Sequence, residues 1–131
     1  MSNSPATNLR SPLGRARGLG SAKEGLHHWW AQRITAVALV PLTIWFVYSV
    51  ASMASGRMDF DLWLLSPINA AALMLFIAVG VHHGVLGLQV VLEDYVPGHF
   101  ARTVSILLVK LVGYGLAAMA IVSTLIVTLG G

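Results

Sequence analysis

The chain has 131 residues, of which 56% are hydrophobic and only 10% carry a charged side chain. Soluble domains have about 25% charged residues, so this composition excludes an ordinary soluble fold and predicts a single membrane domain. The absence of cysteine excludes disulfides, thiolate metal sites and cysteine nucleophiles. Five of the eight Lys and Arg residues fall in the first 33 positions, a charge asymmetry that indicates membrane topology and not a nucleic-acid surface.

Residues 1–25 form the first segment, which combines basic side chains with several prolines and glycines. Because proline and glycine break helices, we expect a flexible, positively charged tail on the cytoplasmic side of the membrane. No apolar stretch follows the charges closely enough for a cleaved signal peptide, and the glycines disfavour the amphipathic helix of a mitochondrial transit peptide. These features favour the bacterial inner membrane over the mitochondrial inner membrane.

Residues 26–131 are expected to form an all-α membrane-anchor domain with three transmembrane helices. Stretches of about 20 apolar residues are long enough to cross the hydrocarbon core. The predicted spans are approximately residues 34–53, 67–92 and 103–128. Pro41 is expected to kink the first span, and Trp29 and Trp30 before it are typical of the membrane interface.

The expected orientation follows from the basic N-terminal segment and from the charges of the first connection. Residues 54–65 form a short loop in which Arg57 is offset by Asp59 and Asp61, so we place this loop outside. Residues 93–102 form the second loop. Three spans and a cytoplasmic N-terminus place this second loop on the cytoplasmic side.

Two histidines and an acidic pair stand out at the end of the second span, because ionisable side chains are costly at membrane depth and usually mark a site. In a helix, the step of eleven residues from His83 to Asp94 is about three turns, which leaves the two side chains roughly 20° apart around the axis and about 16 Å apart along it. Gly80 and Gly87 lie on the same stripe as His83. If Asp94 lies at the membrane surface, His83 lies near the midplane.

Glycines on both sides of a histidine leave room for a planar cofactor to lie against the helix. Haem is such a cofactor, and in helix bundles a histidine nitrogen can serve as the axial ligand of its iron. The alternative is a helix contact through the small residues Gly80 and Gly84, with His83 forming a hydrogen bond across that contact. His82 lies on a different face of the helix, so the spacing selects His83 as the candidate ligand. Geometry alone leaves the haem site and the helix contact both open.

The run HHGVLGLQVVLEDYV at residues 82–96, together with HHWWAQRITAVAL at residues 27–39, resembles the hydrophobic membrane-anchor subunit of succinate dehydrogenase, or complex II. The resemblance implies that His83 is an axial ligand of haem b. It also implies that Asp94 and Tyr95, eleven and twelve residues later, lie beside the ubiquinone site.

The same resemblance implies that Arg33 and His27 approach the haem propionates, where a planar cation suits a carboxylate. The alternative interpretation is that Arg33 only anchors the helix, with its guanidinium among the lipid headgroups on the cytoplasmic side. Gly80 and Gly87 would pack against the macrocycle. Each of these roles is carried over from the family onto matching positions of this sequence.

By this resemblance the chain is not an enzyme on its own but the membrane anchor of succinate:ubiquinone oxidoreductase. It would hold haem b jointly with a second, cytochrome b556-type membrane subunit in one helix bundle and contribute to electron transfer from succinate to ubiquinone. Tyr95 would donate a proton to the quinone, and Asp94 would orient Tyr95 or relay protons. FAD and iron–sulfur clusters are expected on the flavoprotein and iron–sulfur subunits, because this chain has no dinucleotide fingerprint and no cysteine.

Three other functions are compatible with the sequence. Two of them do not involve quinone chemistry, and the third is the same reaction run in the reverse direction. A small transporter or proton-conducting subunit would use His82, His83, Asp94 and Lys110 as a relay, although Lys110 is also interpreted as an anchor that reaches the cytoplasmic surface. A structural assembly subunit would use its histidines only for packing. A fumarate reductase anchor would support the reverse reaction, and neither composition nor spacing separates the two directions.

Overall fold

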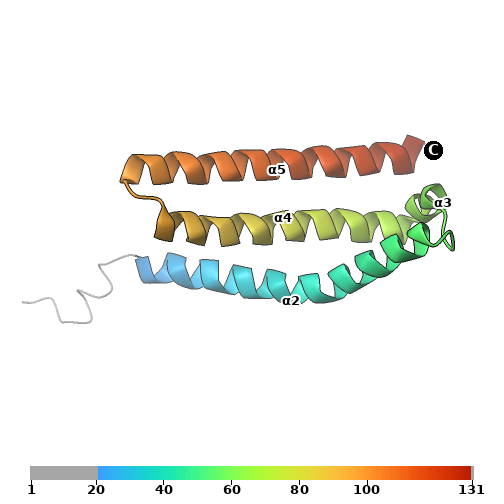
Figure 1. The fold of residues 1–131 in the computed structure, drawn as a ribbon, viewed down its shortest axis with the longest axis horizontal. Helices are drawn as coiled ribbons and strands as arrows, with labels where there is room; N and C mark the ends of the chain where they lie inside the picture. Colours follow the sequence, from blue (N-terminus) through green and yellow to red (C-terminus); the bar gives the residue numbers. More distant parts are fainter. Residues whose placement is uncertain (1–20, 131) are drawn as a thin grey trace, which may run out of the picture. The chain divides into compact units, whose positions relative to one another are not determined.

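The computed structural model describes residues 21–130, which form four helices (Figure 1). They are α2 (Ser21–Ala54), α3 (Phe60–Leu65), α4 (Pro67–Tyr95) and α5 (His99–Gly130). Helices α2, α4 and α5 are long and apolar enough to cross a membrane, with candidate spans Gly25–Ala54, Pro67–Tyr95 and His99–Gly130. The described residues therefore confirm the predicted all-α fold with three membrane-spanning helices.

Helix α2 starts earlier than predicted. It begins at Ser21, inside the segment 1–25 that we expected to be a tail, and residues 1–20 of that segment lie outside the described residues. Gly25 is the only helix-breaking residue in the first half of α2, so the intrinsic cost of helix formation there is small. Arg33 consequently lies inside a helix and not at its entrance.

The chain divides into two compact units between Trp30 and Ala31, within α2. The second unit contains most of α2 and all of α3, α4 and α5. In this unit α2 continues through Pro41, and its axis changes direction along the helix (Figure 1). Proline removes one backbone donor from the helix, so a bend at this position has a direct cause.

The short helix α3 lies in a connection that was predicted to be a loop throughout, and that prediction is wrong for its second half. The Asp59 carboxylate caps α3, because its Oδ1 accepts hydrogen bonds from the backbone N–H groups of Asp61 at 2.9 Å and Leu62 at 3.3 Å. Trp63 and Leu64 are buried, and this burial stabilises a helix that would be too short to form alone.

The second connection is also shorter than predicted. Helix α4 continues to Tyr95 and α5 begins at His99, so residues 96–98 join them in place of the expected loop 93–102. Gly98 makes the turn with a φ of +86°, a conformation that glycine adopts without strain. The acidic–tyrosine pair predicted near the quinone site therefore belongs to the last turn of α4.

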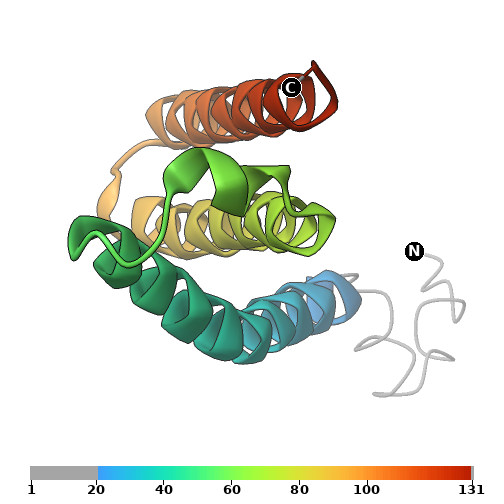
Figure 2. The ribbon, with the colours of Figure 1, turned by 90° about the vertical axis from the view of Figure 1, so that its right-hand side faces the viewer.

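Helix α4 lies between α5 and the part of α2 that belongs to the second unit (Figures 1 and 2). Aromatic stacking connects α2 to its neighbours: the ring centroids of Trp45 and Trp63 are 5.5 Å apart, and those of Phe46 and Phe76 are 4.7 Å apart. Such pairs contribute about 0.5–1.5 kcal/mol each beyond the area they bury. Aromatic packing therefore holds α2 against both α3 and α4.

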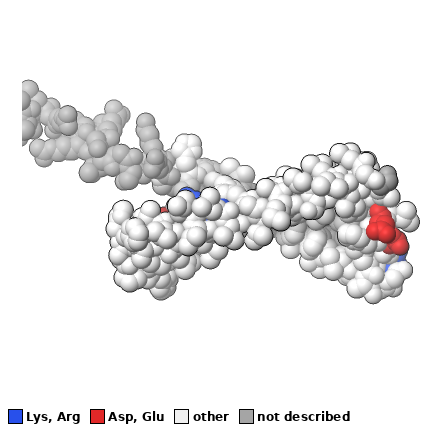
Figure 3. All heavy atoms as spheres, turned by 90° about the horizontal axis from the view of Figure 1, so that it is seen from above, with Lys and Arg blue, Asp and Glu red and all other residues white. Residues whose placement is uncertain are grey.

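Large apolar side chains are exposed along all three long helices, for example Val37 at 72%, Ile68 at 78% and Leu116 at 61% of their surface. Most of the face shown in Figure 3 carries no acidic or basic side chain, and acidic atoms gather at the end where α3 lies. A surface of this kind is costly in water and typical of helices that face lipid or another membrane subunit. The chain is an integral membrane protein.

Candidate functional site

His83 occupies the middle of α4, as the seventeenth of its 29 residues, and is half-buried. Its Nδ1 lies 2.9 Å from Oγ1 of Thr35, a hydrogen-bond contact that joins α4 to α2 across 48 positions of sequence. Thr35 is itself the fifteenth of the 34 residues of α2. Two polar groups near the middle of apolar helices thus satisfy each other where water is scarce.

A groove of about 400 Å³ lies beside His83, between α2 and α4. The remaining lining residues are apolar apart from one threonine: Ala36, Leu39, Val40, Thr43 and Ile44. An apolar groove with few polar groups at its wall is the usual form of a site for an organic cofactor. The groove thus provides one candidate ligand, His83, on a surface that is otherwise mainly apolar.

Gly80 and Gly87 face α2, on the same side of α4 as the candidate ligand. A Cβ atom at Gly80 would lie 3.8 Å from Cδ2 of Leu39, and one at Gly87 would lie 3.7 Å from Nε2 of Gln32. A Cβ at Gly84 would meet no atom within 4 Å, so Gly84 makes no close helix contact in the described part of the chain. The packing of Gly80 and Gly87 against a macrocycle stays a prediction.

His82 lies on the other side of α4, as its position one residue before His83 predicts. Its Nδ1 is 2.9 Å from the hydroxyl oxygen of Tyr114 on α5. The two adjacent histidines are therefore engaged by different helices. This geometry confirms that His82 and His83 occupy different faces, which was the basis for choosing His83.

Asp94 and Tyr95 end α4 and are both exposed, Tyr95 over 81% of its surface. The neighbouring Glu93 accepts a hydrogen bond from Gln89 at 2.8 Å, within the same helix. No described residue forms a hydrogen bond with the hydroxyl of Tyr95. Both side chains remain available to a partner outside this chain, and their quinone role stays a prediction.

Arg33 is exposed and lies two residues before Thr35 in α2. The candidate span Gly25–Ala54 includes it, in the N-terminal third of that span. An arginine in such a position is stable when its guanidinium reaches the headgroups or pairs with an anion. His27 is also exposed and lies in the first unit, and the propionate roles of both residues stay predictions.

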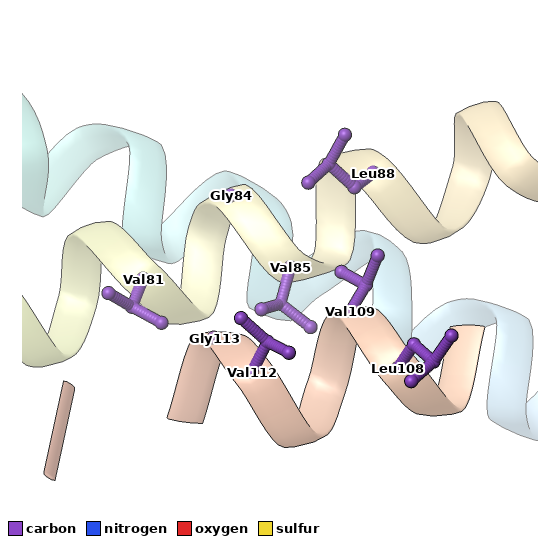
Figure 4. A pocket seen from close by; sticks show the side chains of 8 residues that line it. All are labelled: Val81, Gly84, Val85, Leu88, Leu108, Val109, Val112 and Gly113. Carbon is purple, nitrogen blue, oxygen red and sulfur yellow. The ribbon is translucent and has the colours of Figure 1, made fainter. Parts of the chain in front are cut away.

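A second groove, of about 440 Å³, lies between α4 and α5 (Figure 4). It is lined only by aliphatic side chains and glycine: Val81, Gly84, Val85, Leu88, Leu108, Val109, Val112 and Gly113. No polar atom is placed there to orient a cofactor. The groove marks the packing seam of these two helices, and it is not the candidate site.

The residues of the alternative proton relay do not form one hydrogen-bonded chain within residues 21–130. His82 and His83 contact different helices, and neither Asp94 nor Lys110 has a side-chain hydrogen bond to another described residue. Over the same range, no group of three or more His, Cys, Asp or Glu side chains is placed to hold a metal ion.

Thr35 and Tyr114 were not singled out from the sequence, although each contacts a central histidine. The presence of a hydroxyl side chain in an apolar span does indicate a hydrogen bond between helices, because such side chains often form them. That signal does not identify the partner. Only the packing of the helices shows that Thr35 belongs to the candidate site and Tyr114 does not.

Comparison with known proteins shows the same family along almost the whole chain. Residues 7–128 match the family model described as succinate dehydrogenase/fumarate reductase transmembrane subunit. The succinate dehydrogenase hydrophobic membrane anchor subunit of Rickettsia bellii (strain RML369-C) is 37% identical over 105 residues, which cover 79% of this chain and 84% of the relative. The subunit of the same name from Paracoccus denitrificans is 33% identical over 112 residues, covering 85% and 86% of the two chains.

A succinate dehydrogenase membrane anchor subunit of Reclinomonas americana is 32% identical over 94 residues, covering 69% of this chain and 78% of the relative. No solved structure matches the chain. The matched residues include the mid-helix histidine, the acidic–tyrosine pair and nearly all of the three candidate spans. The chain therefore belongs to the succinate dehydrogenase/fumarate reductase transmembrane subunit family, as a hydrophobic membrane anchor subunit of the succinate dehydrogenase type.

Proposed function

We propose that this chain anchors succinate:ubiquinone oxidoreductase in the bacterial inner membrane, holds haem b jointly with a second membrane subunit, and borders the quinone site. The observation that carries the proposal is the position of His83, in the middle of a membrane-spanning helix and at the wall of an apolar groove. Ionisable side chains at such depth usually serve a site. The names of the relatives favour succinate oxidation over fumarate reduction.

The residues around His83 fit a haem group. An imidazole nitrogen is a common axial ligand of haem iron, and the groove beside it is lined mainly by apolar side chains, which suits the apolar faces of a macrocycle. Gly80 and Gly87 leave α4 without side chains on either side of the ligand along the helix. When bound, haem b would take up and release single electrons; His83 would hold its iron from this chain, and the second membrane subunit would supply the other ligand.

Arg33 supports the same proposal through its charge. A guanidinium is planar, permanently charged and suited to bidentate contact with a carboxylate, which a haem propionate provides. Arg33 lies two residues before Thr35, on the helix that contacts His83. We extend the proposal to His27 as a second propionate contact.

The quinone role rests on the end of α4. Reduction of a quinone needs a proton donor at each carbonyl oxygen, and the Tyr95 hydroxyl is a donor of this kind. Asp94 would orient Tyr95 or pass protons to it from the cytoplasm. The exposure of both residues suits a pocket whose other walls come from partner subunits.

The partners follow from what this chain lacks. Succinate oxidation needs a flavin, and electron delivery to the membrane needs iron–sulfur clusters, but the sequence has no cysteine to hold such clusters. We therefore assign FAD and the clusters to a flavoprotein subunit and an iron–sulfur subunit on the cytoplasmic side. A cytochrome b556-type membrane subunit completes the helix bundle.

The first test is a reduced-minus-oxidised visible spectrum of the complex purified in mild detergent through a tag on this chain. We expect a b-type haem signal that is lost or shifted in His83→Ala and unchanged in His82→Ala, which is the matched control because His82 faces α5. A chain that purifies alone and without colour would contradict the complex II assignment. An unchanged haem signal in His83→Ala would contradict the ligand assignment.

A further inference from the structure

Thr35 has a single hydroxyl hydrogen, and the direction of that hydrogen decides the chemistry of His83. Its Oγ1 lies 2.7 Å from the carbonyl oxygen of Ala31 and 3.0 Å from that of Gln32. Carbonyl oxygens only accept hydrogen bonds, so the hydroxyl hydrogen is used within α2. This is the usual back-bonding of threonine to the preceding turn of its helix.

The same oxygen lies 2.9 Å from Nδ1 of His83. Because the Thr35 hydrogen is already engaged, the contact is a hydrogen bond when Nδ1 carries the proton and Oγ1 accepts it. A neutral imidazole has only one N–H, so its Nε2 then keeps a free lone pair. Within the described residues, Nε2 of His83 makes no hydrogen bond.

We propose that Thr35 is a positioning residue that accepts the Nδ1–H of His83 and so holds the imidazole in the tautomer whose Nε2 is free to ligate haem iron. The inference rests on the proposed haem function, which gives Nε2 its role. Imidazole ligands commonly donate their other N–H to an acceptor, and this bond fixes the ring orientation and raises the basicity of the ligating nitrogen. A methyl group in place of the hydroxyl would remove the acceptor and leave the ring free to turn.

The contact between His82 and Tyr114 provides a matched control inside the same chain. It has the same 2.9 Å separation and joins the same helix to a hydroxyl group of a neighbour. The Tyr114 hydroxyl, however, donates to no carbonyl in the described residues, so its hydrogen is not engaged elsewhere. Removing this hydroxyl tests the general cost of losing a histidine–hydroxyl bond without touching the candidate ligand.

The experiment uses the complete complex with four variants of this chain. Thr35→Val removes the hydroxyl at nearly constant volume, Thr35→Ala removes it without adding bulk, and Thr35→Ser keeps it. Tyr114→Phe is the control. For each complex we would measure the haem content relative to flavin after dilution in detergent, and the haem midpoint potential by redox titration.

We expect the loss of the acceptor to raise the haem midpoint potential and to weaken haem retention. Loss of the acceptor lowers the basicity of the ligating nitrogen, which destabilises ferric haem more than ferrous haem and raises the potential. A tenfold change in the relative affinity for the two states corresponds to about 59 mV for a one-electron couple. We expect a rise of this order in Thr35→Val and Thr35→Ala, with about tenfold weaker haem retention, and wild-type values in Thr35→Ser and Tyr114→Phe.

The inference is overturned if Thr35→Val or Thr35→Ala binds haem with the wild-type potential and retention, or if Thr35→Ser behaves like Thr35→Val. Equal shifts in Tyr114→Phe would also overturn it, since the effect would then be general to the bundle. These outcomes differ from a failure of the proposed function. In that case the wild-type complex would lack haem, or His83→Ala would leave its spectrum unchanged.

Discussion

Tyr95 is the last residue of α4, and its 81% exposure leaves the phenol hydroxyl free to meet a ligand held by other subunits. Asp94 beside it is also exposed. An interfacial tyrosine without further function would have the same exposure. The two interpretations differ in what the hydroxyl does, so the hydroxyl is the group to remove.

We expect Tyr95→Phe to lower succinate–quinone turnover by about a hundredfold or more, because a positioned proton donor contributes on this scale. Electron transfer from succinate to an artificial acceptor that bypasses the quinone should stay at the wild-type rate. Tyr48→Phe is the control, since Tyr48 is also exposed, at 66%, but lies in α2. Full quinone turnover in Tyr95→Phe would refute the donor role.

At the residue scale, the sequence predicted which histidine to choose but not what holds it. The angular separation of His82 and His83 follows from helix geometry alone, and the structure confirms it through their contacts with Tyr114 and Thr35. The hydrogen-bond partner of His83 depends on how α2 packs against α4. No local pattern contains that information.

Helices α4 and α5 approach each other at Gly113 too closely for an added side chain. A Cβ atom there would lie 2.8 Å from Cγ2 of Val85 and 3.6 Å from Cγ1 of Val81, and Figure 4 shows Val85 directed toward this part of α5. Contacts under 3 Å force neighbouring side chains to move. The absence of a side chain at Gly113 is therefore a condition for the packing of the two helices.

We expect Gly113→Ala to destabilise the complex by about 1–3 kcal/mol, the usual cost of overpacking, measured as a lower temperature of thermal unfolding in detergent. Gly115→Ala is the control, because a Cβ at Gly115 would meet no atom within 4 Å. Adding Val85→Ala to Gly113→Ala should recover part of the loss. An unchanged unfolding temperature in Gly113→Ala would contradict the close approach.

At the element scale, the existence and order of the long helices were predictable and their ends were not. The composition of an apolar segment predicts that it spans the membrane. It does not predict where the helix ends, because the residues on either side can also be helical. Helix α2 thus begins at Ser21, well before the predicted membrane span that starts near residue 34. Helix α3 forms because Asp59 caps it and because Trp63 stacks on Trp45, a contact from a distant part of the chain.

The charges of the chain predict how the protein is oriented in the membrane. The positive-inside rule applied to the N-terminal basic cluster predicts that the connection between α2 and α3 is outside and that the connection between α4 and α5 is cytoplasmic. The proposed quinone site at the end of α4 requires the same orientation, because the clusters that deliver electrons are assigned to the cytoplasmic side.

The chain has no native cysteine, so single cysteines report this orientation without background. We expect Ser55→Cys to react with a membrane-impermeant thiol reagent in spheroplasts and Ala101→Cys to react only in inverted vesicles, since both positions are exposed and lie at opposite connections. Leu75→Cys, in the middle part of α4, should react poorly in both preparations. The reverse labelling pattern would contradict the proposed topology and the cytoplasmic quinone site with it.

For the whole molecule, the sequence by itself determined the membrane class, the three spans and the common face of His83 and Asp94. These properties depend on composition and on helical periodicity, which each segment carries without its neighbours. The tertiary structure decided the contact of Thr35 with His83, that of Tyr114 with His82 and the seam at Gly113. Such contacts join residues far apart in the chain, and they depend on the side-chain shapes of two helices at once, which no single stretch of sequence specifies.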